Sequence, residues 1–140
     1  MPSLNFFNEE ITFKLTHPQK TRNWVKSAIK KEGKDLNQIN FIFCSDDYLG
    51  GINVQFLKHK TYTDIITFDN SEGSGRLQGD IFISIDRVTE NASKFKTTFD
   101  EELHRVIIHG VLHLIGYTDK DSTSKNVMRK KEDAYLSLRI

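Results

Sequence analysis

Two histidines and an aspartate in the second half of the chain have the spacing of a metal site. His109 and His113 are four residues apart, so on a helix both imidazoles project from one face and can meet one ion. Gly116 permits a sharp turn, and Asp119 follows it by three residues. The pattern H-x-x-x-H-x-x-G-x-x-D has the spacing of the metzincin zinc site, with aspartate as the last ligand. We therefore predict that His109, His113 and Asp119 bind one divalent ion.

This ligand set indicates hydrolytic chemistry. Three protein ligands on a tetrahedral ion leave one position for water, as in catalytic zinc sites. The same three residues are therefore the predicted catalytic residues, acting through the metal-bound water. One zinc ion per chain is the expected cofactor, and iron(II) is an alternative because it accepts the same donors. Asp121 is an alternative third ligand, although the turn spacing favours Asp119.

The residue after the first histidine argues against a peptidase. Gly110 occupies the position at which zinc peptidases of this spacing carry their catalytic glutamate. Glycine inside a helix costs about 1 kcal/mol relative to alanine. We expect something to offset that cost, either close packing of Gly110 against a strand or access for a bulky substrate.

Composition limits the other classes of function. The chain has 140 residues, of which 37% are hydrophobic and 28% charged, which is typical of one globular domain. Its net charge of +1 means that any polyanion must be bound by local patches. Cys44 is the only cysteine, so an intramolecular disulfide and a multi-cysteine metal site are excluded. No leader pattern or membrane-spanning run is evident, so we expect a cytoplasmic protein without a membrane partner.

The periodicity of apolar residues predicts the elements that position the ligands. Strands are predicted over residues 11–15, 39–44, 65–68 and 79–85. Helices are predicted over residues 18–31 with Thr16 as the cap, after Ser45, and over residues 86–95, 99–115 and 122–138. Segment 69–78 is an expected exposed loop. We expect one α+β domain over residues 1–140, with a roughly four-stranded mixed sheet, about five helices and the metal site on a central helix.

Four segments resemble the YbeY family of rRNA maturation factors. Residues 109–117, HGVLHLIGY, are similar to the family signature, and residues 63–68, TDIITF, resemble its T-D-V-L-S-F segment. Residues 79–84, GDIFIS, resemble its G-D-I-x-I-S strand, and Met128 with Glu132 its C-terminal M-x-x-x-E. These motifs occur in the order and spacing of the family, which makes chance similarity a poor explanation.

The resemblance implies a single metal-dependent hydrolase domain with a bound zinc ion. It also implies a single-strand-specific endoribonuclease acting in 16S rRNA 3′-end maturation and ribosome quality control, with precursor 16S rRNA and the ribosome or its small subunit as partners. Two positions depart from the family pattern. Asp119 stands in place of its usual third histidine, and Leu57 in place of an arginine that precedes Thr63. A zinc metallopeptidase and a non-catalytic ribosome-assembly factor with a structural metal remain the alternatives.

Several other polar residues have structural explanations. His104 lies round the helix from the predicted metal face and, like His17, is expected to be a packing or surface residue. Cys44 and Met128 are expected to be apolar core residues. Asp64 and Asp80 can either cap turns or support the site. Seven basic residues could pair with phosphates, but solvated surface is the favoured interpretation for Lys26, Lys30, Lys31, Lys58, His59, Lys60 and Arg76.

Overall fold

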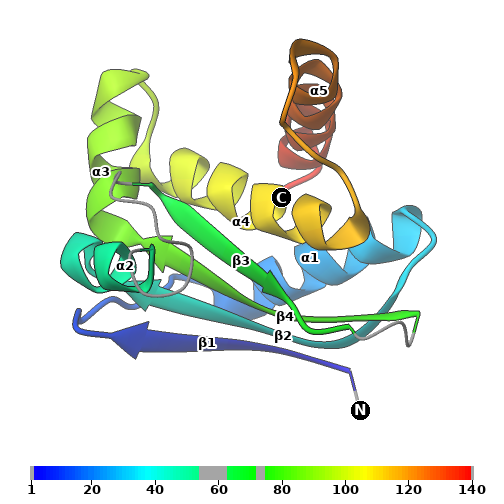
Figure 1. Cartoon of the computed structure of the whole chain (residues 1–140), viewed down its shortest axis with the longest axis horizontal. Coiled ribbons are helices and arrows are strands. Elements are labelled where there is room, and N and C mark those ends of the chain that lie inside the picture. Colours follow the sequence, from blue (N-terminus) through cyan, green and yellow to red (C-terminus); the bar gives the residue numbers. More distant parts are fainter. Residues whose placement is uncertain (1, 54–62, 72–74, 140) are drawn as a thin grey trace.

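A mixed sheet of four strands forms the base of the molecule (Figure 1). The computed structural model describes residues 2–53, 63–71 and 75–139. Its strands are β1 (Ser3–Glu9), β2 (Asp35–Cys44), β3 (Ile65–Asp69) and β4 (Arg76–Ser84). Their order is β1-β2-β4-β3, in which β1, β2 and β4 are parallel and β3 is antiparallel to β4. The predicted four-stranded mixed sheet is therefore confirmed.

Five helices accompany the sheet in the described part of the chain. They are α1 (Pro18–Lys31), α2 (Asp46–Ile52), α3 (Ile85–Lys94), α4 (Phe99–Ile115) and α5 (Ser122–Ser137). Helix α4 lies across the sheet and contacts β3, β4, α1, α3 and α5. Figure 1 shows α3 and α5 standing at opposite ends of α4. The α+β class and the central position of the histidine-bearing helix are as predicted.

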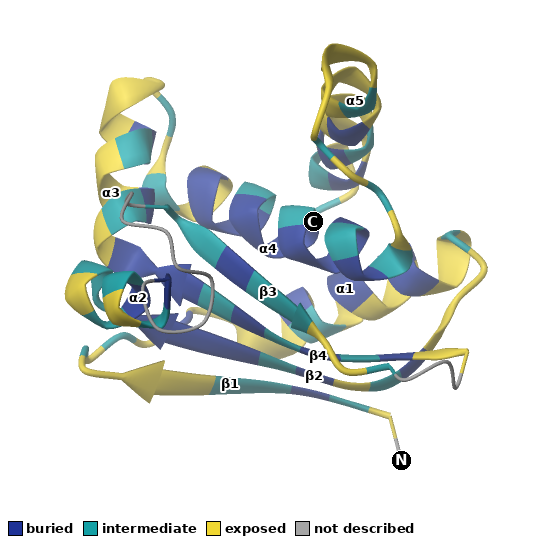
Figure 2. Ribbon diagram, in the orientation of Figure 1, coloured by how far each residue is buried: buried dark blue, intermediate teal, exposed yellow. Residues whose placement is uncertain are grey.

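The main core lies between the sheet and helices α1 and α4, as the dark blue segments in Figure 2 show. Successive strand residues point to opposite faces, so Ile81 and Ile83 join this core while Phe82 packs on the other face with Leu49 of α2. The fully buried residues of α4 include Ile107, Ile108, Val111 and Leu112. This apolar face fixes the rotation of α4 and hence the direction of its histidines.

The predicted first strand at residues 11–15 is wrong. The edge strand is β1, which pairs with β2 from Ser3 opposite Gln38 to Glu9 opposite Cys44. The chain leaves the sheet at Glu10, whose φ of 54° is left-handed. Phe13 still points inward, with its ring centroid 5.0 Å from that of Phe43. The alternating apolar residues of segment 11–15 therefore pack on the core, although the segment does not pair as a strand.

Two smaller predictions also need correction. Thr16 does not cap α1, because His17 occupies the cap position with φ 52° and makes no side-chain cap bond. The expected loop at residues 69–78 is shorter, since β3 ends at Asp69 and β4 begins at Arg76. No helix in the described ranges has the length and apolarity needed to cross a bilayer.

Candidate metal centre

Helix α4 carries the two histidines and has the predicted bounds. Its first turn is capped by Thr98, whose Oγ1 accepts a hydrogen bond from the Glu101 amide at 3.1 Å. Three acidic residues follow in the first turn, where they complement the helix dipole. The helix ends at Gly116, which adopts φ 126° and lets the chain turn back towards the histidine face.

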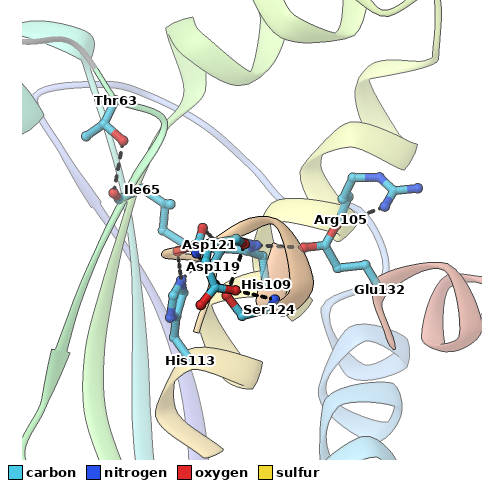
Figure 3. Close-up of polar contacts among 9 residues, drawn as sticks. All are labelled: Thr63, Ile65, Arg105, His109, His113, Asp119, Asp121, Ser124 and Glu132. Carbon is cyan, nitrogen blue, oxygen red and sulfur yellow. Dashed lines mark hydrogen bonds and ion pairs between the residues drawn. The ribbon is translucent and has the colours of Figure 1, made fainter. Parts of the chain in front are cut away.

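The turn brings Asp119 to the two histidines (Figure 3). The Nε2 atoms of His109 and His113 lie 3.0 Å apart. Asp119 Oδ2 lies 3.5 Å from His109 Nε2, and Asp119 Oδ1 lies 3.7 Å from His113 Nε2. In a tetrahedral zinc site with bonds of 2.0–2.1 Å, donor atoms are about 3.3 Å apart. The three predicted ligands are therefore brought together at a separation that fits a metal ion.

Asp121, the alternative third ligand, has another role. Its carboxylate caps α5 by accepting a hydrogen bond from the Ser124 amide at 2.8 Å, and the Ser124 hydroxyl oxygen accepts a hydrogen bond from the Asp121 amide. This reciprocal capping box holds Asp121 at the helix start (Figure 3). The geometry therefore favours Asp119 as the third ligand.

A buried glutamate on α5 orients His109. Glu132 is 5% exposed, and its Oε2 accepts a hydrogen bond from His109 Nδ1 at 2.6 Å. Its other oxygen accepts a bond from Arg105 Nη1 at 2.9 Å. A proton on His109 Nδ1 leaves the Nε2 lone pair directed at His113 and Asp119, as metal binding requires.

The two imidazoles differ in their proton affinity. Burial lowers the pKa of His109, but the hydrogen bond to Glu132 and its charge outweigh burial and raise the pKa above its ordinary value. Burial, followed by the charge of His109, lowers the pKa of His113. Metal binding requires both Nε2 atoms to be free of protons, so a bound ion competes with protons at this pair.

A cavity of about 550 Å³ opens beside the cluster, between α3, α4 and α5. His109, Asp119 and Asp64 line it. Burial raises the pKa of the Asp64 carboxyl, although the charge of His109 acts in the opposite direction. Asp64 thus lies with the site, whereas Asp80 bonds Asn40 at 2.9 Å across the sheet. The sequence allowed both aspartates either to cap a turn or to support the site, and the structure places only Asp64 beside the site.

Comparison with known proteins places the chain in a family. The family model described as "Endoribonuclease YbeY" matches residues 5–138. The chain belongs to the YbeY endoribonuclease family. A YbeY endoribonuclease of Cytophaga hutchinsonii is 53% identical over 134 residues, covering 96% of this chain and 94% of that protein. A second, from Christiangramia forsetii, is 52% identical over 96% of this chain and 93% of its own.

A solved structure has a similar fold. The solution structure of a Thermotoga maritima protein has a TM-score of 0.65 and 27% sequence identity, covering 96% of this chain and 87% of that one. The family model and the curated relatives make the chain a nuclease of the hydrolase class, which confirms the predicted enzyme class and sets the peptidase alternative aside.

The packing of Gly110 opposes a side chain at this position. A Cβ added at Gly110 would lie 2.8 Å from Ile65 Cδ1 and 3.0 Å from Ile81 Cγ2. Of the two expected explanations, close packing against strands is therefore confirmed. A longer side chain at this position would have to displace residues of β3 and β4.

The sequence did not predict a role for Glu132, and this role is testable. Glu132→Gln should weaken metal binding, measured with zinc as the probe ion, by about 10- to 100-fold, because an amide is a poorer acceptor for His109 Nδ1 than a carboxylate. Competition with a chromogenic chelator measures this affinity. Asp133→Ala is the matched control, because Asp133 is 58% exposed and also pairs with Arg105. Unchanged zinc affinity in Glu132→Gln would contradict the orienting role.

A second network holds the turn that carries Asp119. Tyr117 donates a hydrogen bond to Glu32 Oε1 at 2.6 Å, and Lys131 lies 3.0 Å from Glu32 Oε2. Tyr135 also donates to Glu32 Oε2. Burial alone would raise the pKa of Glu32, but these hydrogen bonds outweigh burial and hold the pKa below its ordinary value of 4.5. The end of α1 is thereby tied to the ligand turn and to α5.

Glu32→Gln should lower the free energy of unfolding by about 2 kcal/mol at neutral pH, because charge-assisted hydrogen bonds are lost. A depressed folded pKa gives stability that is present above the unfolded value and lost as the pH falls through the folded value. The difference from wild type should therefore shrink as the pH falls below 4.5. Urea denaturation across this range measures it, with Glu90→Gln, on a 63% exposed side chain, as the control. A pH-independent difference would contradict this account.

The remaining predicted residues divide into three groups. His104 is buried and bonded to Thr21 Oγ1 at 3.0 Å, so its packing role is confirmed. Met128 and Cys44 are buried as predicted, and burial raises the pKa of the Cys44 thiol to about 12. The segment that departs from the family arginine motif, Leu57, Lys58, His59 and Lys60, lies outside the described residues.

Proposed function

We propose that the chain is a zinc-dependent, single-strand-specific endoribonuclease in which His109, His113 and Asp119 hold the catalytic ion. The observation that carries this proposal is the convergence of two Nε2 atoms and a carboxylate at the edge of a cavity, in a member of a nuclease family. Zinc is favoured because nitrogen and carboxylate donors in a three-residue set are typical of its catalytic sites. The biological role that we propose is 3′-end maturation of 16S rRNA and ribosome quality control in the cytoplasm, on the small ribosomal subunit.

Hydrolysis of an RNA phosphodiester requires an activated water molecule and neutralisation of the negative charge on the phosphate. When bound, zinc supplies Lewis-acid chemistry that lowers the pKa of water and offsets phosphoryl charge. Glu132 keeps the proton of His109 on Nδ1, so that Nε2 stays unprotonated and its lone pair is available to the metal. Asp64 lines the same cavity, which places its carboxyl beside the proposed metal centre.

Removing and restoring the metal tests this proposal. After dialysis against a chelator, cleavage of a labelled single-stranded RNA should fall by at least about 100-fold, and one equivalent of zinc should restore it. The same RNA annealed to its complement is the control and should be cut poorly in every preparation. Absence of cleavage at every metal loading, or full activity after chelation, would contradict the proposal.

A further inference from the structure

The cavity beside the metal centre continues past the ligands to an aromatic ring. Phe95, immediately after α3, lines this cavity and is 60% exposed. In the described part of the chain no other aromatic ring stacks on it. The Lys94 Nζ atom lies over its ring, 5.8 Å from the centroid. Figure 2 shows this end of α3 exposed and standing clear of the sheet. A large apolar ring is therefore presented to solvent within the same cavity as His109.

Helix α5 contributes two basic residues to the lining of the cavity. Lys125 and Arg129 of α5 are four residues apart, so they lie on one face of the helix, and both line the cavity. Neither belongs to an ion pair within the described ranges. Arg105, by contrast, is held by Glu132 and Asp133. Two cations therefore face the cavity outside the ion pairs of the described ranges, and the charge of Arg129 acts on the buried Glu102 carboxyl of the same cavity.

Three of the cavity's four carboxylates, those of Asp64, Asp119 and Glu132, act on His109. Asp119 and Glu132 contact His109 directly, at 3.5 and 2.6 Å. Asp64 interacts electrostatically with His109 and with Glu102. The cavity thus has carboxylates at the metal cluster, as a cation site requires, and it also carries two cations and an aromatic ring.

We propose that this part of the cavity is a nucleotide subsite, in which Phe95 stacks an unpaired base while Lys125 and Arg129 bind the adjoining phosphates. An exposed aromatic ring beside cations is how proteins hold single strands, because every base has a stacking face and every nucleotide carries a phosphate. Asn91, one turn before Phe95, also lines the cavity and offers an amide to a base edge. This inference rests on the proposed function only in placing the scissile RNA at the metal cluster.

The subsite explains a preference for single strands. Bases of a duplex are already paired and stacked on one another, so they cannot lie on Phe95 without unstacking. Phosphate contacts alone do not distinguish the two forms in this way. Phe95 is thus the specificity-determining residue, and the two cations add affinity that depends on salt.

Binding measurements on the full chain test the subsite. The probe is a fluorescein-labelled unstructured RNA of about twelve nucleotides, titrated in EDTA and followed by anisotropy. Phe95→Ala should weaken binding of this RNA about 10-fold, and binding of the same RNA in a duplex should not change. Phe95→Trp should retain wild-type affinity. Lys125→Ala and Arg129→Ala should each reduce the slope of log affinity against log salt by about 0.7.

Phe7→Ala is the matched control, because Phe7 is also an exposed phenylalanine, at 51%, but lies on β1. Wild-type RNA affinity in Phe95→Ala, or equal losses for single strand and duplex, would overturn the subsite. Because binding is measured without cleavage, its outcome is independent of the metal chemistry. Metal-independent cleavage with an intact Phe95 effect would sink the proposed function and leave the subsite standing.

Discussion

Replacement of His113 by alanine is expected to reduce RNA cleavage by at least about 1,000-fold while the chain stays folded. His113 supplies one of three proposed ligand atoms, and its Nε2 lies 3.0 Å from that of His109. The side chain is 30% exposed, so its removal opens no sealed cavity in the core. Initial cleavage rates, together with a thermal unfolding curve, measure both parts of the expectation.

His104→Ala is the matched control for the loss of a histidine from the same helix. His104 is 3% exposed and bonded to Thr21, so its loss should lower stability by about 2 kcal/mol and leave the cleavage rate of the folded protein near wild type. If the metal is structural instead, as in a non-catalytic assembly factor, His113→Ala will unfold the chain. An unfolded His113→Ala, or one that cleaves RNA at the wild-type rate, would contradict the catalytic assignment.

Gly79→Ala is expected to cost about 3 kcal/mol of unfolding free energy, although it adds a single methyl group. A Cβ at Gly79 would lie 2.5 Å from the Phe68 carbonyl oxygen and 2.9 Å from Leu114 Cδ2. The carbonyl belongs to β3, which pairs with β4 at this point, so it can move only if the strands separate. Urea denaturation of the two proteins measures the difference.

Gly50→Ala is the control for this substitution. A Cβ at Gly50 meets nothing within 4 Å, and Gly50 lies inside α2, so alanine should stabilise the chain by up to about 1 kcal/mol. A Gly79→Ala protein within about 0.5 kcal/mol of wild type would show that the strands tolerate the methyl group. The close approach of β3 to β4 would then not explain the glycine of the G-D-I-F-I-S strand.

Local spacing predicted the grouping of the proposed ligands, because all three lie within one helix and the turn that follows it. His109 and His113 share a face by helical geometry, and Gly116 has the conformation that returns Asp119 to that face. Glu132 is 23 residues beyond His109 on another helix. Its contact depends on how α5 packs on α4, which residue spacing does not encode. In the sequence, Glu132 was identified only as the last residue of the family's M-x-x-x-E motif.

The fold was predicted well where one apolar face decides the element and poorly where tertiary pairing decides it. Helix α4 has its predicted ends because its caps and buried face agree. Segment 11–15 alternates like a strand, yet the neighbouring place in the sheet is taken by β1, whose exposed residues hide the pattern. Of the seven residues of β1 only Leu4 is buried, so its sequence lacks the alternation of a half-buried strand and the prediction fell on the wrong segment.

The most direct test of the metal-dependent nuclease is elemental analysis of purified Asp119→Ala beside Asp121→Ala and wild type, with RNA cleavage measured on each. Asp121→Ala should lose about 1 kcal/mol of stability, because it removes a helix cap, but keep its ion and its activity. Wild type should contain one zinc ion per chain, and Asp119→Ala should lose both the zinc and the cleavage. An Asp119→Ala protein that retains a full complement of zinc and cleaves RNA at the wild-type rate would contradict the three-ligand centre.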